Sequence, residues 1–214
     1  MEMMYIGVMM PVVEAVWRHL LVGSRSGRRR WSSLSALALE LEVPVSTAHR
    51  SLTHPVEIGA VSVTSLDGLQ VLDPARLLVL FAAHRRVQRD ITKQWRVVAT
   101  ATEVERLATS PTTVLGGFGA VVANLGGTNR VADYSTVLFY GDPGLPDLPF
   151  ASGNEGTEVL VAEPDPLLAR YGRFTPMSQA YADLFSLPGW QAARFVEELD
   201  PRKVASSDEP VLLV

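Results

Sequence analysis

The stretch that decides the fold runs from Ser33 to Val61 and reads SLSALALELEVPVSTAHRSLTHPVEIGAV. Its first part places apolar residues at helical spacing: Leu34, Leu37, Ala38 and Leu41. This spacing predicts a helix whose free amides Ser32 or Ser33 can cap. The break at 42–44 ends it, and a second helix is expected to begin at Ser46, a natural N-cap. Two helices joined by so short a turn predict a helix-turn-helix unit.

The second of these helices carries the candidate recognition residues. Val45, Ala48 and Leu52 are expected to face inward. This orientation turns four polar residues outward as candidates for the DNA major groove: Ser46, Thr47, His49 and Arg50. Three of them have a purely structural alternative: Ser46 as a cap, His49 as an ordinary surface or packed histidine, and Arg50 as a partner of Glu40 or Glu57.

The flanks of this unit complete a winged helix-turn-helix over residues 1–86. An amphipathic helix is expected at 11–22, with Pro11 in its first turn. Downstream, Asp67-Gly68 lies between two β-rich runs, at 60–64 and 69–72, which is a strong hairpin signal. Asp73-Pro74 then begins a helix that reaches about Arg86.

Phosphate contacts are expected from the run Arg28, Arg29 and Arg30, which lies between the first two helices. The alternative is a solvated loop. The hairpin carries Asp67 and no Lys or Arg, so a strong grip on phosphates is not expected there. Some folds of this class serve only protein–protein contacts, and that alternative stays open.

Composition and charge agree with a DNA-binding module joined to a second part of different character. The 214 residues are 47% apolar and 20% charged, an ordinary globular balance. Residues 1–96 hold 12 Arg/Lys against 8 Asp/Glu, whereas residues 97–214 hold 7 against 15. A basic part followed by an acidic part is a known sign of nucleic-acid binding, although chance and a solvated acidic surface would also produce it.

The same composition disfavours several classes of protein, namely disulfide-bonded, thiolate-site, membrane-spanning and secreted proteins. The chain has no cysteine, so no disulfide or thiolate site is expected, as is usual in a reducing cytosol. No apolar run is long enough to span a bilayer, and Met1–Met10 lacks the basic residues of a signal peptide. We therefore expect a cytoplasmic protein without a membrane partner.

The second half predicts an α+β domain over 95–200, followed by a loose tail at 201–214 that could pair as a strand at 211–214. Strands are expected at 95–100, 132–140 and 159–162, and helices from Thr102, Thr175-Pro176 and Trp190. A basic connector precedes the domain: Arg85, Arg86, Arg89, Lys93 and Arg96. Gly117-Phe118-Gly119 lacks a complete phosphate-loop motif, so close packing of a helix explains it better.

Catalysis is not expected in this half, and neither is a metal or cofactor site. A nucleotidyltransferase needs carboxylates close together to hold magnesium. Asp133 stands alone, while Glu163 and Asp165 look like turn residues in a Pro-rich loop. Histidine does not occur beyond His84, which leaves no Ser/His/Asp set to argue.

Three features together resemble the AbiEi family of bacterial antitoxins and transcriptional autoregulators of type IV toxin–antitoxin systems. They are DPARLL at 73–78 running into His84-Arg85-Arg86, the strand, Gly-rich helix and strand core, and TPMSQAYADLFSLPG at 175–189. The resemblance covers most of the chain, and only the last stretch is fairly specific. It implies an N-terminal winged helix, a C-terminal domain related to nucleotidyltransferases but non-catalytic, and repression of its own operon. It also implies action against a nucleotidyltransferase toxin without tight binding to it.

The sequence thus predicts an α+β protein that represses transcription by binding double-stranded DNA at its own promoter. Inverted repeats and a homodimer are further expectations, because a two-fold protein matches two-fold DNA. One rival is an effector-responsive regulator with a ligand pocket lined by Trp95, Phe118 and Tyr134. A third alternative is a nucleotidyltransferase with an accessory winged helix.

Overall fold

A computed structural model describes residues 12–64 and 66–206. The chain is α+β, with 46% of it helical and 17% in strands. Three expectations lie outside the described residues: the role of Pro11, the character of Met1–Met10 and a strand at 211–214.

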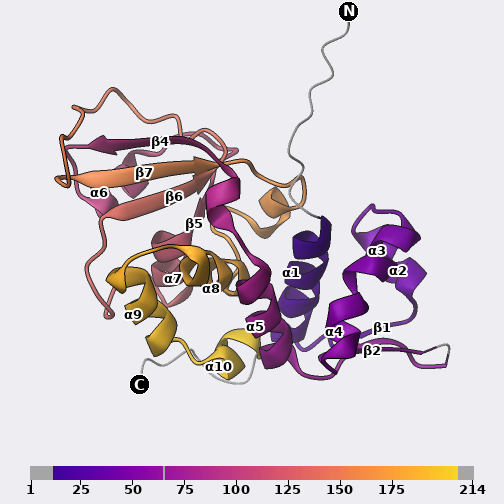
Figure 1. Cartoon of the computed structure of the whole chain (residues 1–214). Helices are drawn as coiled ribbons and strands as arrows, with labels where there is room; N and C mark the ends of the chain where they lie inside the picture. Colours follow the sequence, from indigo (N-terminus) through magenta and orange to yellow (C-terminus); the bar gives the residue numbers. More distant parts are fainter. Residues whose placement is uncertain (1–11, 65, 207–214) are drawn as a thin grey trace, which may run out of the picture.

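The first half consists of helices around a small antiparallel sheet (Figure 1). In chain order its elements are α1 (Val12–Arg25), β1 (Arg30–Trp31), α2 (Leu34–Glu40), α3 (Val45–Ser51), α4 (Thr53–Glu57), β2 (Val61–Thr64), β3 (Gly68–Val71) and α5 (Pro74–His84). The strand order is β1-β3-β2. Helix α3 packs on both α1 and α2, and Trp17 of α1 donates a hydrogen bond of 2.6 Å to the carbonyl of Ser51.

Among the helix starts predicted in the first half, those at Ser33 and Asp73 are confirmed, and the one at Ser46 is wrong. The side chain of Ser33 accepts from the amide of Ala36, and that of Asp73 accepts from the amide of Arg76. The N-cap of helix α3, however, lies two residues earlier than expected, at Pro44 instead of Ser46. Ser46 therefore lies inside the helix, and Val45 is 45% exposed instead of facing inward.

The hairpin is confirmed, and Gly68 occupies the turn position predicted for it. Gly68 has a φ of 70°, and a Cβ there would lie 2.5 Å from the carbonyl oxygen of Ser32. Only glycine tolerates both the left-handed backbone and this close approach. The approach arises because β1, a strand that the sequence pattern did not reveal, pairs with β3 through Arg30 and Gln70.

The second half is a four-stranded mixed sheet with helices on both faces. Its elements are β4 (Ile91–Val97), α6 (Ala101–Leu107), β5 (Val114–Gly116), α7 (Gly117–Asn124), β6 (Thr136–Tyr140), β7 (Thr157–Ala162), α8 (Met177–Ser186), α9 (Trp190–Glu198) and α10 (Pro201–Ala205), with short 3-10 turns at Val87–Arg89 and Leu168–Tyr171. The strand order is β4-β7-β6-β5, in which β6 and β7 are parallel and the other pairs antiparallel.

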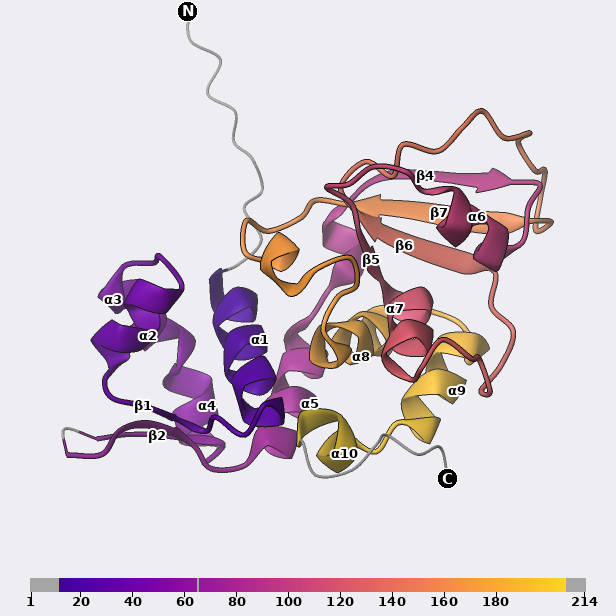
Figure 2. The same cartoon turned by 180° about the vertical axis from the view of Figure 1, so that it is seen from behind.

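The faces of this sheet follow the alternation of its side chains. Leu138 and Tyr140 belong to the core shared with α7 and α8, whereas Val137 and Phe139 pack with α6. Figures 1 and 2 show α6 on one side of the sheet and α7, α8 and α9 on the other.

Several expected details of the second half are wrong. Strand β4 begins at Ile91 and β6 only at Thr136. Helix α8 begins at Met177, after Thr175-Pro176, with Pro176 in the N-cap position. Helix α9 buries Ala192 and Phe195, leaving Trp190 67% exposed.

Residues 201–205 are not a loose tail. They form α10, which Asp200 caps by accepting a hydrogen bond from the amide of Arg202. Val204 and Ala205 are buried, and α10 packs on α5 and α1. Burial of these two apolar side chains explains why the segment is ordered here.

The two halves share one hydrophobic core. It runs from Trp17 and Phe81 in the first half to Tyr181 and Phe195 in the second. Helix α5 packs along α8, and α1 also touches α8. The domain boundary between 86 and 95 remains a prediction, but the parts on either side of it are in extensive contact. Among the described helices, none combines the length and apolarity that a bilayer crossing requires.

Candidate nucleic-acid interface

Helix α3 presents a polar face to solvent at the outer edge of the molecule. Ala48 and Leu52 are buried and anchor the helix, while Ser46, His49 and Arg50 are exposed. Thr47 is half-buried, and its carbonyl accepts a hydrogen bond of 2.9 Å from the hydroxyl of Ser51. Both views place α2, α3 and the β2–β3 hairpin on the side away from the second half (Figures 1 and 2).

The two carboxylates expected as possible partners of Arg50 both bind other residues. Glu40 is bound by Arg28, and Glu57 accepts a hydrogen bond of 2.9 Å from His54. Within residues 12–64 and 66–206, Arg50 makes no ion pair. Its guanidinium group is thus available to a ligand of opposite charge.

The three consecutive arginines are in three different environments. Arg28 donates to both carboxylate oxygens of Glu40, at 2.9 and 2.5 Å, and lies 4.7 Å over the ring of Trp31. These hydrogen bonds, with smaller contributions from His19 and Trp31, lower the pKa of Glu40 to about 2. Most of the charge of Arg28 is therefore balanced within the protein.

Arg30 and Arg29 remain available. Arg30 lies on β1 opposite Gln70, which is in turn opposite Ser62 of β2, so the three residues form a polar row across one face of the sheet. This row adds a cation to a sheet whose hairpin has none. Arg29 lines a groove of about 680 Å³ together with Arg76 and Arg202.

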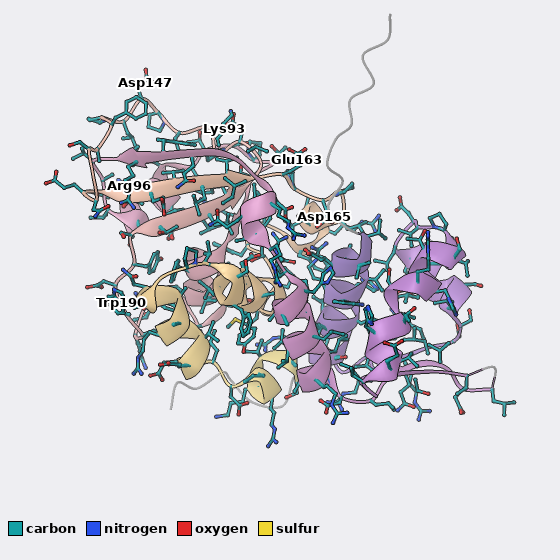
Figure 3. All side chains as sticks on the ribbon, viewed as in Figure 1. Lys93, Arg96, Asp147, Glu163, Asp165 and Trp190 are labelled. Atoms are coloured by element: carbon teal, nitrogen blue, oxygen red, sulfur yellow. The ribbon has the colours of Figure 1, made fainter. Side chains whose placement is uncertain are left out.

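Three residues of the basic connector, Arg85, Lys93 and Arg96, are paired with carboxylates, whereas Arg86 and Arg89 are exposed. Arg85 is 1% exposed and is the centre of a buried cluster. Lys93 and Arg96 lie on β4 (Figure 3), 3.7 Å from Asp142 and 3.6 Å from Glu158 respectively. Sequence alone could not reveal this, because the acidic partners are 5 to 98 residues away along the chain.

The buried cluster around Arg85 joins α1, α5, α8 and the sheet. Arg85 forms ion pairs with Glu14 at 2.9 Å, with Asp183 at 3.0 Å and with Asp90, and donates 2.8 Å to the hydroxyl of Tyr140. Burial raises the pKa of Glu14, and burial also raises the pKa of Tyr140 well above its usual range. Such a cluster holds α1, α5, α8 and the sheet in one arrangement, because each of its charges would be costly to bury alone.

A second buried pair lies beside the first. Arg18 of α1 donates hydrogen bonds of 2.8 Å to Asp165 and 3.2 Å to Gln179. Its guanidinium group lies 5.4 Å from the centre of the Tyr171 ring. Figure 3 shows Asp165 at the junction of the two halves. Asp165 is therefore not an ordinary turn residue, which corrects the reading of the Pro-rich loop.

Arg170 links the second half to the turn that precedes α3. It donates 3.0 Å to the carbonyl of Glu40, at the end of α2, and forms an ion pair with the carboxylate of Glu42. Glu42 has a φ of 55°, a left-handed conformation that is uncommon outside glycine. Arg170 thus holds the residue that sets the direction in which the chain enters α3.

The pocket proposed for an effector does not form where it was expected. Phe118 stacks on Tyr134 at 4.9 Å and meets Phe195 edge-on, so these rings fill one another's space. Trp95 packs with the α6 side of the sheet, opposite Phe118. Nor do Asp133 and Glu163 take part in a metal-binding group, since the described residues contain none of three or more suitable side chains.

Comparison of the chain with protein-family models, with curated proteins and with solved structures gives no match. The functional argument therefore depends on the site itself.

Proposed function

We propose that the chain is a transcriptional repressor that binds double-stranded DNA through a winged helix-turn-helix, with α3 as the recognition helix. The observation that carries this proposal is the exposed face of α3, on which the side chains of Ser46, His49 and Arg50 have no hydrogen-bond or ion-pair partner among the described residues. Short polar and cationic side chains on an exposed helix match the donors and acceptors at base edges in the major groove.

The neighbouring charges support the same orientation. Arg30 lies on the three-stranded sheet, the element that forms the wing in this proposal, and positive charge there suits backbone phosphates. Arg28, whose charge is largely balanced by Glu40, is assigned a structural role in holding the end of α2 near β1, whose Trp31 also donates to Glu40.

The finer proposal follows the AbiEi resemblance. The second half then serves as a non-catalytic antitoxin or regulatory domain, the DNA is the chain's own promoter, and the toxin is a nucleotidyltransferase. A homodimer on inverted repeats is the simplest binding mode, because α3 is exposed on one edge of the molecule.

The test is binding of the purified protein to its own upstream DNA by fluorescence anisotropy. We expect affinity to fall steeply with salt, because phosphate contacts release counterions. Arg50→Ala is expected to weaken specific binding by about 5- to 150-fold, as loss of a bidentate contact to guanine would. Arg130→Ala, an exposed arginine in the second half, is the matched control. Equal affinity of wild type and Arg50→Ala would refute the assignment of α3.

A further inference from the structure

The second half contains a cleft beneath α6 that the proposed repressor function does not use. Its volume is about 410 Å³, within the range of small-molecule sites. Apolar side chains from three elements form part of the lining, among them Leu115, Val122 and Phe139. Phe174, in the segment that precedes α8, adds an aromatic side chain that is 38% exposed.

One wall of the cleft carries a carboxylate without a cation. Glu105 of α6 is half-buried and accepts a hydrogen bond of 2.9 Å from the hydroxyl of Tyr134. No described cation forms an ion pair with Glu105. A half-buried carboxylate in this situation is poorly compensated, because burial removes water without supplying an opposite charge.

Gly119 makes room for that carboxylate. A Cβ at this position would overlap Glu105 Oε1 and lie 2.6 Å from Leu115 Cδ2. The backbone of Gly119 is helical and does not require glycine, and glycine inside a helix costs about 0.5–1 kcal/mol relative to alanine. The absence of a Cβ at Gly119 therefore leaves a space, and the carboxylate of Glu105 fills it.

The opposite charge lies on another wall. Arg173 lines the cleft, is exposed and makes no ion pair within the described chain. Arg106 lines it as well. The carboxylate of Glu105, the guanidinium group of Arg173 on a separate segment and an apolar floor are complementary to a molecule that has an ammonium, a carboxylate and an apolar body.

We propose that this cleft binds a free amino acid with an apolar side chain. Glu105 receives the ammonium group, Arg173 receives the carboxylate, and Phe174 with Leu115 contacts the side chain. Both charged contacts are of the charge-assisted kind, which are the stronger hydrogen bonds in proteins.

The same segment connects the cleft to the turn before α3. Arg173 and Phe174 lie three and four residues after Arg170, which bonds to Glu40 and Glu42. An amino acid that draws Arg173 inward would move this segment and with it the support of α3. This regulatory consequence rests on the proposed function, whereas the binding site itself does not.

Isothermal titration calorimetry without DNA tests the site. The probes are L-phenylalanine, 3-phenylpropionate, which lacks the ammonium, and 2-phenylethylamine, which lacks the carboxylate. We expect phenylalanine to bind at least about tenfold more tightly than either analogue. Glu105→Gln should weaken phenylalanine about tenfold and leave 3-phenylpropionate unchanged, while Arg173→Gln should weaken both acids and leave 2-phenylethylamine unchanged.

Two controls keep the result interpretable. Glu155→Gln and Arg130→Gln repeat the same chemistry at exposed positions and should change nothing. Gly119→Ala displaces the carboxylate without removing its charge, and it should weaken phenylalanine as Glu105→Gln does. Absence of binding to the folded wild type at millimolar phenylalanine, or binding that ignores Glu105 and Arg173, would overturn the site.

The link to DNA is tested separately by measuring affinity for the upstream DNA with and without phenylalanine. We expect a change of several-fold in the wild type and none in Arg170→Ala. Ligand binding without any DNA binding would refute the proposed function and leave the site intact. DNA binding without ligand binding would do the reverse, and binding of both without coupling would overturn the regulatory consequence.

Discussion

Replacing Arg85 by methionine should be among the most damaging single changes in this chain. The substitution removes the cation that three carboxylates share, and these carboxylates stay buried without it. Asp183 keeps donors, since Tyr140 and Gln179 still reach it at 2.7 and 2.8 Å. Glu14 and Asp90 keep no other side-chain donor among the described residues. Breaking a buried pair by removing one partner costs about 3–5 kcal/mol.

The size of this effect can be measured by urea and thermal unfolding. In a chain of this length each kcal/mol moves Tm by about 2–4 °C, so Arg85→Met should lower Tm by roughly 6–20 °C. Arg89→Met is the matched control, because Arg89 is exposed and unpaired within the described residues, and its change should stay within about 0.5 kcal/mol.

The pH dependence gives the sharper test. Burial raises the pKa of Glu14 in the folded protein, and Arg85 opposes that rise, so Arg85→Met should raise the pKa further. A carboxyl with a raised folded pKa binds its proton more tightly in the folded state than in the unfolded state. Its stabilisation is therefore complete below the unfolded pKa and is lost as pH rises through the folded pKa. The deficit of the variant should shrink as pH falls toward 4.5.

Arg85→Met combined with Glu14→Gln should recover part of the loss, since the amide no longer carries an uncompensated charge. A deficit below about 1 kcal/mol, or one that stays constant between pH 7 and pH 5, would refute the reasoning.

Three further predictions concern the first half. Arg30→Ala should reduce the slope of log affinity against log salt by about 0.9, whereas Arg28→Ala should change it less because Glu40 balances that charge; equal slopes would contradict this. Glu40→Gln should cost about 1 kcal/mol at neutral pH, and the difference should vanish as pH falls from the unfolded pKa through about 2, the folded pKa. Gly68→Ala should cost about 2–4 kcal/mol in urea unfolding, against about 1 for Gly27→Ala, where φ is 84° and no atom lies within 4 Å of the added Cβ.

Local signals in the sequence predicted much of the first half. Ser33, Asp73 and Gly68 each act through atoms within three residues or through their own backbone angles, so composition and order alone reveal them. The α+β class followed from the same kind of evidence.

What the sequence could not reveal depends on partners that are distant along the chain. Arg85 reads as a surface cation because the partners that bury it include Glu14 and Asp183, 71 and 98 residues away. The direction of Phe118 and Tyr134 was likewise missed, since their stacking depends on Phe195. The start of α3 was misplaced for a local reason, because Pro44 competes with Ser46 for the cap position.

The contacts of α1 have a consequence for the order in which the chain folds during synthesis. This helix is completed at Arg25, yet it packs against α8 and α10, and α10 ends at Ala205. At ordinary rates of translation those partners follow roughly 10 to 40 s later. Until then α1 and α5 expose the apolar faces that the second half will cover. We expect nascent chains to remain incompletely folded over this interval, so that a truncated product would be recognised by chaperones and proteases.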